Sequence, residues 1–170
     1  MTVITVVARE GRLDLDQRRT LAETLTDAAL VPEVGRFAPA ARGGFQVHFV
    51  EREPGMMAIG GRLLADTAEN LDVMVIDVAV MDGDWRQEVR AEAIERMLAA
   101  MARARGLEEP PPTWWVNFRV IEEGSWGSRG GVLSILSLLD SGVFTEEKIK
   151  AVRAALVEGG FRGQNPATPG

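Results

Sequence analysis

The chain opens with MTVITVVAREGR, residues 1–12, and this stretch decides the fold. Its β-branched valines and isoleucine favour a strand, and the Glu-Gly pair at residues 10–11 supplies the turn that ends it. A strand that begins at Met1 brings the amino-terminal end of the chain inside the fold. Since desolvation lowers the pKa of an α-amino group, such a group can act as a base near neutral pH.

Length and composition narrow the classes of protein that this chain can be. Its 170 residues suffice for one compact domain or two small fused units, and a hydrophobic fraction of 46% can form a core. The net charge of −6, without a basic cluster, argues against a nucleic-acid or anionic-membrane partner. No apolar run approaches the roughly 20 residues of a membrane span, so we expect a soluble cytoplasmic protein. The absence of cysteine excludes disulfides, and a single histidine without a carboxylate cluster predicts no metal and no cofactor.

Hydrophobic periodicity predicts the remaining elements. A helix over 14–30 begins at a variant capping box formed by Asp14 and Gln17, and Pro32 breaks it. A second pair of the same kind, Asp84 and Gln87, predicts the start of another helix. Strands are expected at 45–52, 72–80, 114–121 and 132–139, and the strand at 72–80 is apolar enough to be buried on both faces. Glycine-rich hairpins are expected at 59–61 and 127–131. A last helix is expected at 145–157, followed by a flexible tail at 159–170.

The two halves of the chain repeat the same pattern. At an offset of 69 residues, Val47, Phe49 and Glu53 match Val116, Phe118 and Glu122, and the glycines of the two hairpins also coincide. We therefore predict an α+β fold made of tandem β-α-β units, over roughly 1–68 and 69–140, within a single domain over 1–158. Right-handed crossovers make the strands of each unit parallel. The units then join into a four-stranded mixed sheet with two helices on one face, and the other face must be buried elsewhere, most simply in an oligomer.

The ordered set of these motifs resembles the tautomerase superfamily. The opening strand, the Glu-Gly-Arg turn and the amphipathic helix are similar to 4-oxalocrotonate tautomerase. Residues 26–28 (TDA), 115–118 (WVNF) and 143–145 (VFT) resemble the fused members, above all those related to cis-3-chloroacrylic acid dehalogenase. The resemblance spans residues 2–157 and implies a homotrimer that binds a small molecule.

The residues that carry the chemistry in that family are mostly replaced here. The catalytic amino-terminal proline corresponds to Thr2, and the histidine of the first helix corresponds to Ala29. The two arginines fall at Met81 and Asp84, and the tyrosine falls at Asn117. The glutamate position lies near Trp126. The resemblance therefore does not imply hydrolysis of cis-3-chloroacrylate, because a water-activating carboxylate and an arginine clamp are both missing.

Seven residues remain as candidates for a site. Thr2 would offer a free amine if Met1 is removed; if Met1 is retained, the amine lies about 3.5 Å away and Thr2 is an ordinary strand residue. His48 is either a general acid or base or a structural residue in its strand. Arg12, at the family's strand-end arginine, either clamps an anion or pairs with a nearby carboxylate such as Glu10 or Asp14. The candidate pocket walls are Met57, Trp115 and Trp126, and the alternative for the two tryptophans is a place in the core or in the trimer interface. Asn117 lies on the same strand face as Trp115.

Two hypotheses follow. In the first, the protein lacks the usual proline but isomerises or tautomerises a small oxo or enol acid. In the second, it is a catalytically silent ligand-binding or assembly protein that keeps the same trimeric scaffold. The retained Arg12 favours the first, and the loss of the dehalogenase residues favours the second.

Overall fold

The computed structural model describes residues 1–67, 71–128 and 130–158. The predicted tail at 159–170 lies outside these residues. The two halves of the described chain have the same order of elements. The first half consists of β1 (Thr2–Arg9), α1 (Leu15–Val34), β2 (Phe45–Arg52) and the hairpin of β3 (Ala58–Ile59) with β4 (Arg62–Leu63). The second consists of β5 (Met74–Met81), α2 (Gln87–Ala104), β6 (Trp114–Ile121) and the hairpin of β7 (Trp126–Ser128) with β8 (Gly131–Leu133).

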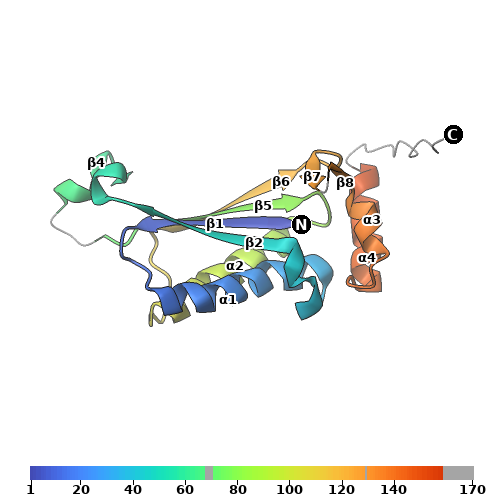
Figure 1. Ribbon diagram of the computed structural model, residues 1–170, viewed down its shortest axis with the longest axis horizontal. Coiled ribbons are helices and arrows are strands. Elements are labelled where there is room, and N and C mark those ends of the chain that lie inside the picture. The colour runs from blue at the N-terminus through green and yellow to red at the C-terminus, as the bar shows by residue number, and fades with distance from the viewer. Residues whose placement is uncertain (68–70, 129, 159–170) are drawn as a thin grey trace.

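The four long strands form one mixed sheet in the order β2-β1-β5-β6. Each β-α-β unit contributes a parallel pair, β1 with β2 and β5 with β6. The two units join through an antiparallel pairing of β1 with β5, in which Thr2 lies opposite Val80. Figure 1 shows α1 and α2 side by side below this sheet. The predicted α+β architecture is thus confirmed.

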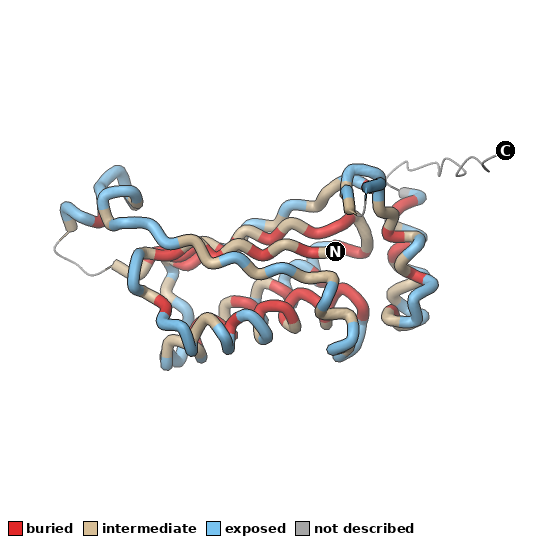
Figure 2. Tube along the Cα trace, in the orientation of Figure 1, coloured by how far each residue is buried: buried red, intermediate tan, exposed pale blue. Residues whose placement is uncertain are grey.

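The main core lies between the sheet and these two helices. Alternate residues of β1 and β5 face the helices and are buried, among them Ile4, Val6, Ile76 and Val78. Their neighbours on the other face are only half-buried, as Figure 2 shows by the alternation of colours along the strands. The expectation that β5 is buried on both faces is therefore not met within one chain, because both long helices cover the same side of the sheet.

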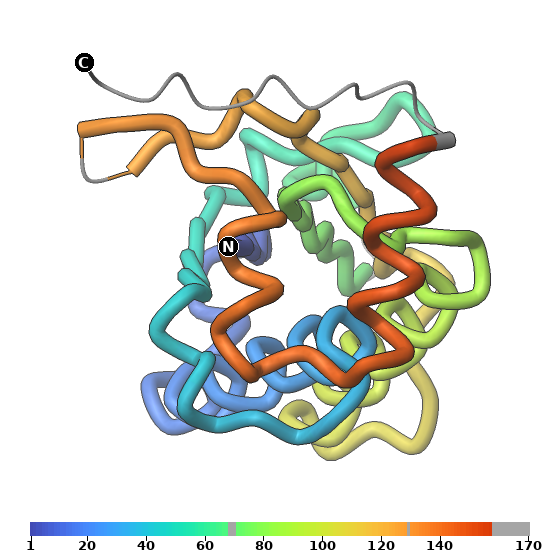
Figure 3. The backbone as a smooth tube through the Cα atoms, turned by 90° about the vertical axis from the view of Figure 1, so that its right-hand side faces the viewer, coloured from blue at the N-terminus to red at the C-terminus, as the bar shows by residue number. Residues whose placement is uncertain are grey.

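A second apolar cluster closes the end of the sheet at which β1 begins. Two short helices, α3 (Ile135–Leu139) and α4 (Glu146–Glu158), pack there against the last turn of α1 and the end of β5. Figure 3 shows α3, in orange, beside the amino-terminal residue, and α4, in red, on the other side of the same end of the molecule. Met1 is partly buried against this cluster. The start of the chain is therefore enclosed by segments that follow it by more than 130 residues.

Three sequence-based boundaries were wrong. Helix α1 continues through Pro32 to Val34, because the packing of Leu30 and Val34 in the second cluster stabilises the additional turn. Asp84 does not cap α2, which begins after Arg86 without a side-chain cap. The expected strand over 132–139 ends at Leu133 and is followed by α3, because a short apolar run does not by itself distinguish a strand from a buried helix.

The capping box at the start of α1 is confirmed. Asp14 Oδ1 accepts a hydrogen bond from the backbone N–H of Gln17 at 2.8 Å, and Gln17 Oε1 accepts one from the N–H of Asp14 at 3.0 Å. At the other end, Gly35 adopts a left-handed conformation with a φ of 82° and donates its N–H to the carbonyl of Val31 at 2.9 Å.

Gly35→Ala is expected to lower the free energy of unfolding by about 2 kcal/mol, because a side chain is disfavoured at positive φ and also lacks space here. A Cβ atom at this position would lie 2.6 Å from Thr145 Oγ1. Gly60→Ala is the matched control, since Gly60 also has a positive φ but nothing within 4 Å of the added Cβ. Denaturant unfolding measures both variants, and equal losses would show that the contact with Thr145 is unimportant.

Candidate functional site

The amino-terminal end of the chain continues the pairing of β1 with β5. The backbone N–H of Met81 donates to the carbonyl of Met1 at 3.3 Å. The terminal ammonium of Met1 donates to the thioether sulfur of Met81 at 3.4 Å. Thr2, with an exposed fraction of 1%, pairs with Phe45 of β2 and Val80 of β5. The first residues are thus held in place by backbone bonds to both neighbouring strands.

One hollow, which we call the outer hollow, opens beside this terminus. Its volume is about 390 Å³. It lies where β1 and β2 begin, β6 ends and the β7–β8 hairpin folds back. Gln46, Ser125 and Ser128 give it polar groups, and Trp126 and Ile121 give it apolar walls. Among the described residues that line it, none carries a charged side chain, and the amino terminus is the positive group that they supply. The described residues that line it are Met1, Thr2, Val3, Gly44, Gln46, Ile121, Ser125, Trp126, Gly127 and Ser128.

A second hollow, which we call the inner cavity, also borders Met1. Its volume is about 260 Å³, and most of its lining side chains are apolar. Of the described residues that line it, Glu33, in the last turn of α1, is the one with an ionisable side chain. The lining consists of Met1, Leu30, Glu33, Val34, Ala40, Ala41, Gly43, Gly44, Phe45, Leu138, Ser141, Val143 and Phe144.

Glu33 is a buried carboxyl group beside the amino terminus. Its exposed fraction is 8%. Burial raises the pKa of Glu33, and the terminal ammonium, the Thr2 hydroxyl and Lys148 oppose this shift. The Thr2 hydroxyl lies close enough to the Glu33 carboxyl group to lower this pKa. The geometry between them is not that of a regular hydrogen bond, and neither Thr2 Oγ1 nor Glu33 Oε2 has another partner among the described residues. A buried carboxyl group and the amino terminus therefore share this end of the sheet.

The structure brings two of the seven predicted residues together, Thr2 and Trp126, which both line the outer hollow. Three others lie on the face of the sheet that the helices leave open. There, His48 Nε2 is 3.0 Å from Gln46 Oε1, and Asn117 donates to Asp77 at 3.1 Å. Trp115 has an exposed fraction of 57%, whereas Trp114 is buried in the main core, as the alternation of a strand requires.

The remaining two residues lie at the opposite end of the sheet. Arg12 follows the end of β1, and Met57 precedes the β3–β4 hairpin, which Figure 1 shows far from the amino terminus. Arg12 donates two hydrogen bonds to Asp72, at 2.8 and 2.7 Å, which raise the pKa of its guanidinium. Its partner is thus neither Glu10 nor Asp14, and its charge is already compensated.

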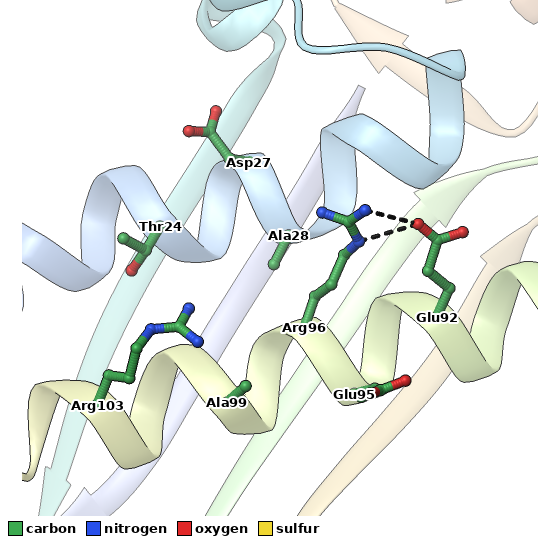
Figure 4. Close-up of a pocket in the computed structure, with 8 residues that line it drawn as sticks. All are labelled: Thr24, Asp27, Ala28, Glu92, Glu95, Arg96, Ala99 and Arg103. Atoms are coloured by element: carbon green, nitrogen blue, oxygen red, sulfur yellow. Dashed lines mark hydrogen bonds and ion pairs between the residues drawn. The ribbon is translucent and has the colours of Figure 1, made fainter.

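A larger hollow, of about 500 Å³, lies between α1 and α2 on the outside of the helical layer. Figure 4 shows its charged side chains, with Arg96 bound to Glu92 of the preceding turn. Asp27, on the α1 side, is bound instead by Arg42. Because these charges compensate one another at an exposed helix surface, this groove is a weaker candidate than the amino-terminal end.

Sequence reasoning missed Glu33 and the role of Met81. A glutamate near the end of an amphipathic helix is normally solvated, and no periodicity marks it as buried. Met81 was noted as a replaced arginine, but its contact with the terminal ammonium depends on the antiparallel joining of the two units. Among the described residues, no group of three or more histidine and acidic side chains could hold a metal ion.

Comparison with solved structures identifies the fold. A member of the cis-3-chloroacrylic acid dehalogenase family aligns with a TM-score of 0.64 and 20% identity, over 89% of this chain and 99% of that one. A native fused 4-OT aligns with a TM-score of 0.60 and 24% identity, over 76% and 94%. The macrophage migration inhibitory factor of Toxoplasma gondii aligns with a TM-score of 0.57 and 13% identity, over 77% and 99%. No family model and no curated protein sequence matches the chain.

The chain therefore has the fold of the tautomerase superfamily, which the sequence predicted. The two-unit arrangement corresponds to that of the fused 4-OT structures, one of which is described as a symmetric trimer. None of the helices in the described parts of the chain is both long and apolar enough to cross a membrane.

Proposed function

We propose that the protein belongs to the tautomerase superfamily and moves a proton within a small oxo or enol acid at the outer hollow. The observation that supports this most strongly is the enclosed amino-terminal end, where Thr2 is buried and borders a hollow with polar and apolar walls. A neutral amine there can take a proton from one atom of the substrate and return it to another, which leaves the composition of the substrate unchanged.

In this proposal Thr2 supplies the amine after Met1 has been removed. With Met1 in place, the terminal ammonium contacts Met81 and lies one residue outside the position of the family's proline. Removal of Met1 would leave the new amine next to the Thr2 hydroxyl. It would also empty the volume of Met1, which lines both the outer hollow and the inner cavity.

The other predicted residues can join this site only through further copies of the chain. Arg12 and Met57 lie at the far end of the same sheet, and His48, Trp115 and Asn117 lie on its open face. We propose a homotrimer in which the open faces pack together. In it, these residues approach the amino-terminal pocket of a neighbouring copy. His48 would act there as a second base, and the others would bind the substrate. The half-buried apolar residues on that face, including Val7 and Val75, favour such packing.

A second function has specific support: a silent ligand-binding or assembly protein on the same scaffold. The Met1 carbonyl and ammonium are both engaged by Met81, and Arg12 is engaged by Asp72. In that state neither the terminal ammonium nor the Arg12 guanidinium is available to a substrate.

The test compares two preparations of the chain, one with Met1 retained and one with it removed, each verified by mass spectrometry. Ketonisation of phenylpyruvate and of 2-hydroxymuconate is followed by ultraviolet absorbance, and light scattering establishes whether each preparation is trimeric. We expect activity in the preparation without Met1, and its loss when the terminal amine is acetylated.

Trimers without activity above the uncatalysed rate in either preparation would support the silent scaffold instead. Arg12→Ala and His48→Ala test the remaining assignments. If activity is unchanged in both variants, neither residue has the proposed role.

A further inference from the structure

The hydroxyl group of Thr2 is a buried nucleophile for which proton transfer by the terminal amine has no use. Its oxygen, Oγ1, has no hydrogen-bond partner of regular geometry among the described residues. Buried polar atoms in native proteins are almost always satisfied, so an exception calls for a role. The sheet holds Thr2 through its pairing with Phe45 and Val80, and neither pairing involves Met1.

Removal of Met1 would place an amine and a hydroxyl group on the same residue. A threonine at the amino terminus is an activated nucleophile, because its own amine can accept the proton of the hydroxyl group. A proline in this position would have the amine but no hydroxyl. Thr2 therefore permits a class of reaction, transfer of an acyl group, that a terminal proline cannot perform through a side-chain oxygen.

The inner cavity supplies the space for such a reaction. The Glu33 carboxyl group lies beside the Thr2 hydroxyl and also lines this cavity. Met1 lines it too, so loss of Met1 would enlarge it next to Thr2. Even with Met1 present, its volume of about 260 Å³ exceeds the roughly 150 Å³ of an engineered apolar cavity that holds benzene. Its apolar walls include Leu30, Val34, Phe45, Leu138 and Phe144.

The character of these walls selects an uncharged substrate, because a charged group would lose its hydration among them. Burial raises the pKa of Glu33 and so favours its neutral carboxylic acid. Lys148, one of the groups that oppose this shift, is itself bound to Asp84 at 3.0 Å. A neutral carboxyl group can donate a hydrogen bond to a carbonyl oxygen on which negative charge develops.

We propose that the chain without Met1 takes an acyl group from a small, uncharged aryl ester in the inner cavity, with Thr2 Oγ1 as nucleophile, the Thr2 amine as base and Glu33 as hydrogen-bond donor to the carbonyl oxygen. The inference shares with the proposed function the removal of Met1, and otherwise goes beyond it in reaction and in substrate class.

The proposed reaction has two balanced steps. In the first, a bond forms between Thr2 Oγ1 and the carbonyl carbon, and the bond from that carbon to the aryl oxygen breaks. The aryl oxygen leaves with the electron pair, and the hydroxyl proton passes to the amine and from there to the leaving oxygen. In the second, water adds to the acyl carbon, the carboxylic acid leaves, and Oγ1 regains its proton.

The test uses 4-nitrophenyl acetate with the full chain from which Met1 has been removed. Absorbance follows the release of 4-nitrophenolate, and mass spectrometry locates the acetyl group. We expect acetylation at Thr2, and a release rate that falls by about 100-fold or more in Thr2→Val, which keeps the amine and the shape of the side chain but lacks the hydroxyl. Thr2→Ser keeps the hydroxyl and should restore most of the rate. The preparation that retains Met1 is a comparison without any substitution, and it should be as slow as Thr2→Val.

Glu33→Met tests the hydrogen-bond donor, and a loss of about 100-fold is expected. Glu95→Met is the matched control, because Glu95 lines the groove between α1 and α2, and it should keep the full rate. Circular dichroism verifies that each variant is folded. The anionic ester 4-acetoxybenzoate, compared with 4-nitrophenyl acetate relative to the uncatalysed rates, should be accelerated about tenfold less.

Equal rates in the chain without Met1 and in its Thr2→Val variant would show that the hydroxyl is not the nucleophile, and would overturn the proposal. Acetylation elsewhere than at Thr2, or equal acceleration of the anionic ester, would overturn it as well. Acylation of Thr2 in a chain that does not ketonise phenylpyruvate would reject the proposed function alone. Ketonisation without acylation would reject only the inference drawn here.

Discussion

Leu25→Ala is expected to lower the free energy of unfolding by about 2–5 kcal/mol, the cost of a large-to-small change in a packed core. Leu25 has an exposed fraction of 0% and lies on the face of α1 that packs against the sheet. Residues of β1 and α2 belong to the same cluster, so the surroundings can collapse only partly into the space that the missing atoms leave. Urea unfolding followed by circular dichroism measures the loss.

Leu15→Ala is the matched control for this prediction. It makes the same chemical change in the same helix, but Leu15 has an exposed fraction of 59%. We expect a change within about 0.5 kcal/mol, as for most surface substitutions. Similar losses for the two leucines would mean that α1 does not pack on the sheet through the face described here.

Asp84→Asn is the second substitution with a large expected effect, a loss of about 3 kcal/mol, which is the low end for breaking a buried ion pair. Asp84 is buried and accepts hydrogen bonds from Arg86 at 2.6 Å and from Lys148 of α4 at 3.0 Å. The asparagine keeps the shape of the side chain but removes the carboxylate that is ion-paired and hydrogen-bonded to the largely buried ammonium of Lys148. Thermal and denaturant unfolding at neutral pH measure the loss.

The effect of Asp84→Asn should depend on pH in a defined direction. Burial alone would raise the pKa of Asp84, but the hydrogen bonds from Arg86 and Lys148 overcome it, so this pKa lies below its ordinary value. A lowered pKa in the folded state stabilises the protein above the ordinary aspartate value of about 3.9. This contribution is lost as the pH falls through the lowered pKa. The difference between Asp84→Asn and the unmodified chain should therefore be constant near neutral pH and shrink in acid.

Asp16→Asn provides the comparison, because Asp16 also pairs with an arginine, Arg19, but at an exposed helix surface. Exposed pairs contribute little, so we expect a change below about 1 kcal/mol. If both asparagine variants cost the same, the link that Asp84 forms between the start of α2 and helix α4 does not stabilise the fold.

Much of the fold could be predicted because its signals are local. The capping box of Asp14 and Gln17 set the start of α1, and the alternation over Trp114–Ile121 gave the bounds of β6. The repeat at an offset of 69 residues predicted that two β-α-β units share one sheet. Three boundaries were wrong: the end of α1 at Pro32, the cap at Asp84 and the strand over 132–139. All three concern segments that form α3 or contact α3 and α4.

What the sequence by itself determined is the strand at the amino terminus, the duplicated module and the absence of proline at residue 2, because periodicity and residue identity need no knowledge of distant contacts. Only the tertiary structure decided that Met81 contacts the terminal ammonium, that Glu33 lies buried beside it, and that Arg12 is held by Asp72 at the far end of the sheet. Each of these contacts joins residues at least 30 positions apart, so their strength follows from burial and geometry that local sequence does not encode.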